Sequence, residues 1–195
     1  MATLAENADG LVEFPASGTG FGRYGTVDAG GQSKTPSETV GSGDHFVTPE
    51  TAAALFGLVN VLNANGITID FGDMSSSNGS DPWQAGSKHH AGHGHNGNRS
   101  GLDVDFRYVD TNGNSFQSPN AFNSSSYSSA NNQTVFDTAD TFGFTVNYQG
   151  TSGNLAGVKK VSGHNDHGHI GRANNNSNVT TIRARKQSVW ATPPR

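Results

Sequence analysis

The sequence has no cysteine and few charged residues. Without cysteine, the chain can have no disulfides, no thiolate metal ligands and no cysteine nucleophile. Charged residues make up 14% of the chain and the formal net charge is -4, so the composition gives no support for binding to nucleic acid or to an anionic surface. Hydrophobic residues are also scarce at 32%, and Gly, Ser, Asn and Thr take their place, which predicts a modest core carrying long polar loops.

Long apolar runs are missing as well. No run approaches the roughly 18 residues that a membrane-spanning helix needs, so we expect no membrane span. The N-terminal segment MATLAENADG has neither the basic start nor the apolar stretch of a secretory signal. If the protein works outside the cytoplasm, we expect it to be delivered by another route or to be the mature form of a secreted protein.

The distribution of apolar residues predicts an α+β fold with a small central, mostly antiparallel sheet, a few flanking helices and long polar loops. We expect a single domain over 1–195, made of an irregular N-terminal wrap over 1–45, a core over 46–172 and a polar tail over 173–195. Thr48-Pro49-Glu50 is typical of a helix start, and Asn65-Gly66 of a helix end. The remaining expected elements are a helix over 133–142 and strands over 67–71, 102–108, 144–148, 158–161 and 167–170.

Seven of the eight histidines fall in two short windows. We call 88–95 the first histidine window and 163–170 the second, and the segment Asp103-Val-Asp105 lies between them on an expected strand. Zinc without cysteine ligands takes histidine nitrogens and carboxylate oxygens, and a catalytic zinc site keeps three protein ligands and an open position for water. One His-rich tract is as often incidental as functional. Two windows flanking an acidic strand favour a metal site.

Strand geometry groups these residues further. Side chains two positions apart on a strand point to the same face, so His167 and His169 share a face, and so do Asp103 and Asp105. One of the two histidines can bind the metal while the other reaches the attacking water. One of the two aspartates can be a metal ligand while the other accepts a hydrogen bond from the N–H of a ligand histidine.

Four motifs in a fixed order resemble those of a known family. They are Gly72-Asp73-Met74-Ser75, His90-Ala-Gly-His93, Ser100-Gly-Leu-Asp-Val-Asp105 and Gly163-His-Asn-Asp-His-Gly-His169. Together they resemble the penicillin-insensitive murein endopeptidases, which are relatives of the D-alanyl-D-alanine carboxypeptidases and the lysostaphin-type metallopeptidases. The resemblance covers 48–170, and it depends on the ordered combination because each motif is weak alone.

The resemblance implies a zinc ion held by a histidine of the first window, by Asp105 and by His169. It implies that His167 is the catalytic base and that His164 is a further active-site histidine. It also places Asp73 near the site, where this acid would orient a histidine.

The identity of the first histidine ligand stays open between two positions. The family spacing would place it at position 98, where this chain has Asn98, so an insertion must lie before Gly101. If the His-x-x-His motif aligns with His90 and His93, the ligand is His93 and His90 lies close to the metal or the substrate. If only the last histidine of the window aligns, the ligand is His95. We favour His93.

The function implied by the resemblance is that of a zinc-dependent peptidoglycan endopeptidase cutting cross-links of the D-Ala–meso-diaminopimelate type. A D-Ala-D-Ala carboxypeptidase or an L-Ala-D-Glu endopeptidase is the alternative on the same scaffold, and a non-catalytic, metal-stabilised binding or structural module is the alternative among non-enzymes. The expected partners are stem peptides of bacterial peptidoglycan, together with an immunity protein or a delivery machinery if the protein is an antibacterial effector. We expect it to act in the periplasm or cell wall, delivered by a phage, by a contractile injection system or as a mature secreted form.

Overall fold

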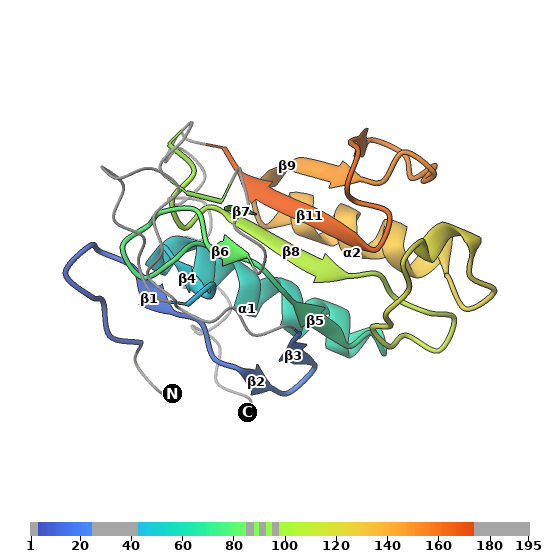
Figure 1. Ribbon diagram of the computed structural model, residues 1–195. Helices are drawn as coiled ribbons and strands as arrows, with labels where there is room; N and C mark the ends of the chain where they lie inside the picture. Colours follow the sequence, from blue (N-terminus) through green and yellow to red (C-terminus); the bar gives the residue numbers. More distant parts are fainter. Residues whose placement is uncertain (1–3, 25–42, 85–87, 90–92, 95–97, 174–195) are drawn as a thin grey trace, which may run out of the picture.

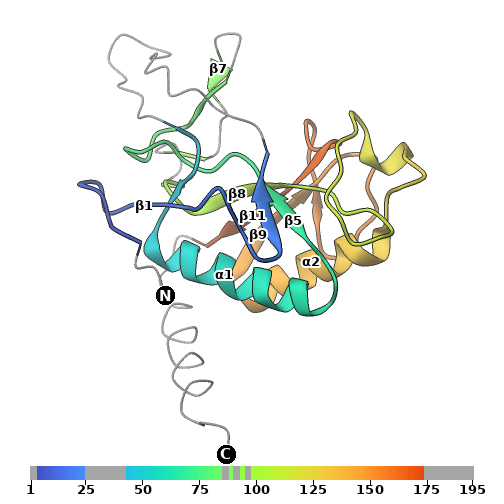
Figure 2. The ribbon, with the colours of Figure 1, turned by 90° about the horizontal axis from the view of Figure 1, so that it is seen from below.

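The computed structural model describes residues 4–24, 43–84, 88–89, 93–94 and 98–173. Its main feature is a sheet of seven strands with two helices against one face (Figures 1 and 2). The helices are α1 (Pro49–Ala64) and α2 (Ser129–Thr141), preceded in the second case by the 3-10 helix η1 (Ala121–Asn123). The strands are β1 (Val12–Glu13), β2 (Ser17–Gly18), β3 (Phe21–Arg23), β4 (Phe46–Val47), β5 (Ile69–Phe71), β6 (Trp83–Gln84), β7 (Lys88–His89), β8 (Asp103–Arg107), β9 (Phe144–Gln149), β10 (Lys159–Lys160) and β11 (His167–Arg172).

The strands of the main sheet run in the order β10-β9-β11-β8-β5-β3-β2. The pairings β9–β11, β11–β8, β8–β5 and β3–β2 are antiparallel, whereas β10–β9 and β3–β5 are parallel. The predicted α+β fold with a mostly antiparallel sheet is therefore confirmed, and the sheet is larger than the small one expected. Its central strands, β11 and β8, carry His167 and His169 of the second histidine window and the Asp-Val-Asp segment.

Helix α1 begins and ends where the sequence predicts. The Thr48 hydroxyl accepts a hydrogen bond from the Thr51 N–H at 3.1 Å, and Pro49 occupies the first turn. The helix ends at Ala64 with Asn65 as its C-cap, and the following Gly66 has a φ of 74°, in the left-handed region that favours glycine. The apolar side of the helix is buried, so α1 shields one face of the sheet from water.

Helix α2 begins before the predicted start at residue 133. Its first turn is polar, so apolar spacing alone does not reveal it, and the Ser128 hydroxyl caps it by accepting a hydrogen bond from the Asn131 N–H at 3.2 Å. The buried Asn132 amide accepts from the Val109 N–H at 2.9 Å and donates to the Val109 carbonyl at 2.8 Å, which ties the helix to the chain just after β8. Among the residues that the structure describes, no helix is long and apolar enough to cross a membrane.

Alternate residues of β8 separate the core from the opposite face of the sheet. Val104 and Phe106 belong to the core, and the ring of Phe106 lies 5.3 Å from that of Phe136 on α2, measured between centroids. Because strand side chains alternate, Asp103 and Asp105 point away from the helices. The polar face of β8 is thus available for a site.

Strand β11 has the same alternation. A Cβ atom at Gly168 would lie 2.5 Å from the Phe106 ring, so position 168 belongs to the core side and needs glycine for space. His167 and His169 therefore point away from the helices, to the same side as the acids of β8.

The described part of the N-terminal segment is more regular than the irregular wrap expected over 1–45. Strand β3 pairs with β5 and extends the main sheet, and β1 pairs with β4. Phe14 and Phe21 pack on Phe71 of β5, with centroid distances of 5.7 Å and 6.3 Å, so the scattered aromatic residues anchor this segment. The tail expected over 173–195 lies outside the described residues, apart from residue 173.

Candidate metal centre

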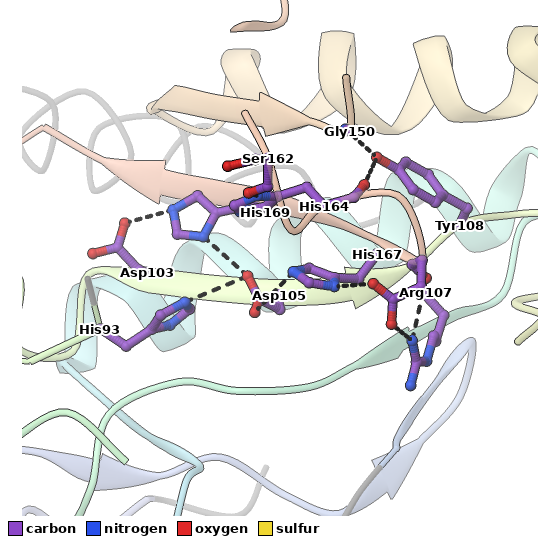
Figure 3. A network of polar contacts seen from close by, with 11 residues as sticks. His93, Asp103, Asp105, Arg107, Tyr108, Gly150, Ser162, His164, His167 and His169 are labelled. Carbon is purple, nitrogen blue, oxygen red and sulfur yellow. Dashed lines mark hydrogen bonds and ion pairs between the residues drawn. The ribbon is translucent and has the colours of Figure 1, made fainter. Parts of the chain in front are cut away.

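Strands β8 and β11 bring the Asp-Val-Asp segment against the second histidine window. They pair with His169 opposite Asp105 and Gly171 opposite Asp103. Directly opposed residues of an antiparallel pair have side chains about 4.5–5.5 Å apart on one face, which is close enough for polar contact. Figure 3 shows His167 and His169 gathered around Asp105.

Three buried residues from distant parts of the chain, His93, Asp105 and His169, form a group that could hold a metal ion. Their ligand atoms lie within 4.8 Å of one another. Asp105 Oδ1 is 2.9 Å from His169 Nδ1 and 3.4 Å from His93 Nε2. Two imidazole nitrogens and one carboxylate oxygen are donors that suit a divalent transition metal.

His93 reaches the group from the first histidine window. It follows the β6–β7 pair, which lies on the side of the sheet away from the helices (Figure 2). The backbone N–H of His93 donates a hydrogen bond to Asp81 Oδ1 at 2.9 Å. A Cβ atom at Gly94 would collide with the Asp81 backbone, so only glycine lets the two segments pack this closely. His90 and His95, the predicted neighbour and the alternative ligand, lie outside the described residues.

Burial and neighbouring charges set the protonation of the ligands. Burial alone would raise the pKa of Asp105, but His93 and His169 hold it well below its ordinary value, so this carboxylate is ionised. Burial alone would lower the pKa of His169, but hydrogen bonds to Asp103 and Asp105 raise it to about 9. Without metal, His169 is therefore protonated at neutral pH, and a metal ion held by this group would have to displace one proton from it.

Asp103 and Arg99 support the far side of His169. The His169 Nε2–H donates to Asp103 Oδ1 at 3.0 Å. Arg99 donates to the same carboxylate from Nε at 2.6 Å and from Nη2 at 2.5 Å. Burial would raise the pKa of Asp103, but the hydrogen bonds from His169 and Arg99 lower it. We call Arg99, Asp103 and His169 the inner arm.

A second set of contacts, built in the same way, holds His167. Its Nδ1–H donates to Asp166 Oδ1 at 2.8 Å, and its Nε2 lies 3.5 Å from Asp105 Oδ2. Arg107 Nη1 donates to Asp166 Oδ2 at 2.8 Å, and the Tyr24 ring centroid lies 4.0 Å from the guanidinium carbon. Burial would raise the pKa of Asp166, but His167 and then Arg107 lower it to about 2. We call Arg107, Asp166 and His167 the outer arm.

His164 lies beside the outer arm. Its Nδ1–H donates to the Ser162 carbonyl at 3.1 Å, and its ring centroid is 4.8 Å from that of His167. Burial, followed by the neighbouring His167, lowers the pKa of His164, so this histidine is neutral at neutral pH. Tyr148 stacks on His169 at 4.9 Å and meets His164 edge-on at 5.8 Å, which fixes the position of both rings.

A buried tyrosine holds the loop that carries His164. The Tyr108 hydroxyl donates to the His164 carbonyl at 3.0 Å and accepts from the Gly150 N–H at 3.2 Å. Burial raises the pKa of Tyr108, so the hydroxyl keeps the proton that it donates. A Cβ atom at Gly150 would lie 2.6 Å from the His164 carbonyl oxygen, so glycine permits this close approach.

The structure brings together most of the site residues predicted from the sequence, namely His93, Asp103, Asp105, His164, His167 and His169. Asp73 reaches the group through its backbone, because its carbonyl accepts a hydrogen bond from the Asp105 N–H at 2.9 Å. That Asp73 orients a histidine stays a prediction.

Asp103, which holds His169, was predicted to contact a histidine, but Asp166, Arg99 and Tyr148 were not predicted as site residues. Asp166 lies inside the second histidine window, and Arg99 lies four residues before Asp103. Both are therefore close in the sequence to residues that were predicted for the site. Arg107 shares the strand face of Asp103 and Asp105 by the same period of two, whereas Tyr148 left no signal, since only the pairing of β11 and β9 brings it to the site.

No protein-family model matches the chain, and no curated protein matches it. The fold and the site therefore define a class only: an α+β protein with a buried His–Asp–His group that could hold a metal ion. The likeness to the murein endopeptidases is carried by the sequence motifs alone.

Proposed function

We propose that the protein is a zinc-dependent peptidoglycan endopeptidase that hydrolyses cross-links of the D-Ala–meso-diaminopimelate type in the bacterial periplasm or cell wall. The observation that carries the proposal is the buried His93–Asp105–His169 group with the His167 ring directed at the same carboxylate. Three nitrogen and oxygen ligands fit a catalytic zinc site, which leaves a position for water. The motif resemblance supplies the substrate class.

In this proposal two histidines hold the zinc ion and a third acts as the base. His93 and His169 hold the zinc ion together with Asp105, and a bound zinc ion acidifies water and polarises the scissile carbonyl. His167 takes the proton of the attacking water at Nε2, because its Nδ1–H is committed to Asp166. As the C–N bond breaks, His167 returns that proton to the leaving amine.

His164 supports substrate binding in the same proposal. Its Nδ1–H is committed to the Ser162 carbonyl, so its Nε2 has a lone pair. This nitrogen can accept a hydrogen bond from an N–H of the substrate peptide. A purely structural zinc site is closed by four protein ligands, whereas the buried group has three members among the described residues and the partly exposed His167 beside it. This arrangement favours an enzyme over a metal-stabilised module.

Digestion of purified sacculi tests the proposal. We expect the zinc-loaded protein to convert cross-linked muropeptide dimers to monomers, and a chelator to stop the reaction. The His167→Ala variant should keep the zinc ion at His93, Asp105 and His169 and lose about 10²–10⁴-fold in rate. His45→Ala is the matched control, because His45 contacts Glu13 and Asp44 and belongs to neither arm.

Product masses identify the bond. A carboxypeptidase would release D-alanine, and an L-Ala-D-Glu endopeptidase would separate the stem peptide after its first residue. If zinc-loaded protein released nothing from any type of sacculus, the proposal would be wrong.

A further inference from the structure

The two carboxylate oxygens of Asp105 face different histidines. Oδ1 lies 2.9 Å from His169 Nδ1 and 3.4 Å from His93 Nε2. Oδ2 lies 3.5 Å from His167 Nε2. One buried carboxylate therefore stands between two separate sets of imidazole nitrogens, as Figure 3 shows.

His164 joins His167 and Asp105 in the second set. Each of the three offers a ligand atom, and these atoms lie within 4.8 Å of one another. The Nδ1–H of each histidine is already committed, to the Ser162 carbonyl at 3.1 Å and to Asp166 at 2.8 Å. Histidine ligands of metals show this pattern, because a hydrogen bond at one ring nitrogen fixes the tautomer and leaves the lone pair of the other for the ion.

We propose that Asp105, His164 and His167 form a second subsite for a divalent transition metal ion, with Asp105 bridging two ions. Imidazole donors favour zinc-like ions over magnesium and calcium, which prefer oxygen alone. Ions of two-metal sites lie about 3.5–4 Å apart, a spacing that one carboxylate can bridge. The His167 side chain is 13% exposed, against 1% for His93, so the second ion meets more water and exchanges faster than the first.

A second ion has a consequence for catalysis. An ion at His167 Nε2 occupies the lone pair that would otherwise take a proton from water. Hydrolysis should then rise with the first equivalent of zinc and fall as the second subsite fills. This consequence depends on the proposed function, whereas the subsite itself depends only on the geometry of its three residues.

Metal counting tests the subsite without an activity assay. Wild-type, His164→Ala and His45→Ala proteins are brought to equilibrium by dialysis against rising zinc concentrations, and the bound zinc is counted. We expect His164→Ala to saturate with one ion fewer than the wild type, and His45→Ala to match the wild type. His167→Ala should lose the same ion and serves as the second variant. Equal zinc content in wild type, His164→Ala and His167→Ala would overturn the subsite.

Cobalt(II) substitution tests the bridge. Two cobalt ions on one carboxylate are close enough for their spins to couple, so a coupled electron paramagnetic resonance signal should appear with the second equivalent in the wild type and vanish in His164→Ala. Ions bound elsewhere on the chain would leave the spectrum uncoupled, and an uncoupled spectrum at saturation counts against the bridge. A coupled pair without release of muropeptides would overturn the proposed function alone. If muropeptides were released, excess zinc did not inhibit their release and the cobalt spectrum were uncoupled, the subsite alone would be overturned.

Discussion

The inner arm and the outer arm follow the same plan but differ in exposure. In each arm an arginine holds an aspartate, and the aspartate accepts a hydrogen bond from a histidine that also faces Asp105. The Asp103 side chain of the inner arm is 1% exposed, whereas the Asp166 side chain of the outer arm is 38% exposed. The same residue types thus occupy two very different environments around one carboxylate.

The difference follows from the place of each aspartate in the fold. Asp103 lies on the central strand β8, opposite Gly171 of β11, and a Cβ atom at that glycine would collide with its carboxylate. Asp166 lies in the turn just before β11. A residue that holds a metal continuously benefits from burial, whereas a base has to reach water. In the proposed function, exposure rather than residue type therefore separates the arm of the metal ligand His169 from the arm of the base His167.

Removal of each aspartate is the strongest test of this contrast. Asp103→Ala removes the buried carboxylate that accepts hydrogen bonds from Arg99 and from the His169 Nε2–H, so we expect the metal-free protein to lose about 3–5 kcal/mol of unfolding free energy. Asp166→Ala removes a partner that is 38% exposed, and the loss should be about 1 kcal/mol or less. Urea unfolding in the presence of a chelator measures both values. Equal losses would mean that burial does not distinguish the arms.

Asparagine at the same positions separates metal binding from the reaction. Asp103→Asn weakens the acceptor of the His169 N–H, so zinc affinity should fall about 10–100-fold. Asp166→Asn should leave the affinity for the ion at His93, Asp105 and His169 unchanged and lower hydrolysis by about 10–100-fold, because His167 loses its orienting partner. Competition with a chelating dye reports the affinity, and muropeptide release reports the rate. Weaker binding of that first ion in Asp166→Asn would show instead that the outer arm holds it.

The raised pKa of His169 predicts that zinc binding depends on pH. Burial lowers this pKa, but Asp103 and Asp105 outweigh burial and raise it from 6.5 to about 9. Zinc must displace that proton, so its affinity should rise about tenfold per pH unit until pH approaches the pKa. Calorimetry in buffers of different ionisation enthalpy should count about one released proton per zinc ion at neutral pH. Binding without proton release would mean that His169 is neutral in the metal-free protein.

The same shift stabilises the metal-free fold over a defined pH range. Because the folded pKa of His169 lies above the unfolded one, the stabilisation is complete below pH 6.5 and is lost as pH rises through about 9. Asp103→Asn should flatten this part of the stability curve, which unfolding experiments at several pH values measure.

Strand periodicity makes much of the site predictable from the sequence. The period of two places His167 with His169 and Asp103 with Asp105, and the structure has both pairs on one face. Periodicity does not determine which strands pair or in which register, because those contacts join segments far apart in the chain. The position of His169 opposite Asp105 therefore required the structure.

The strands that were not predicted from the sequence were missed for a similar reason. Strands β2 and β3 have only two or three residues each, too few for a periodic pattern. The N-terminal strands are fixed by aromatic packing on β5, a contact that no local pattern encodes. Capping, by contrast, is local, and Thr48-Pro49 marks the start of α1 correctly.

The two arginines hold their aspartates with different geometry. Lysine substitutions at these positions test this difference, and their expected effects on stability are the smallest. Arg99 uses two nitrogens on the two oxygens of Asp103, whereas Arg107 uses Nη1 alone for the carboxylate and the carbonyl of Asp166. A lysine cannot reproduce the two-pronged contact, so Arg99→Lys should cost about 1–2 kcal/mol of unfolding free energy.

Arg107→Lys keeps a charge beside a partly exposed carboxylate, so its cost should stay below about 0.5 kcal/mol. Denaturant unfolding of the two lysine variants side by side measures the difference, and each serves as the control for the other. A cost at Arg107 equal to that at Arg99 would mean that the outer arm is positioned as strictly as the inner one. Exposure would then not explain why the proposed function assigns the base role to His167 rather than to His169.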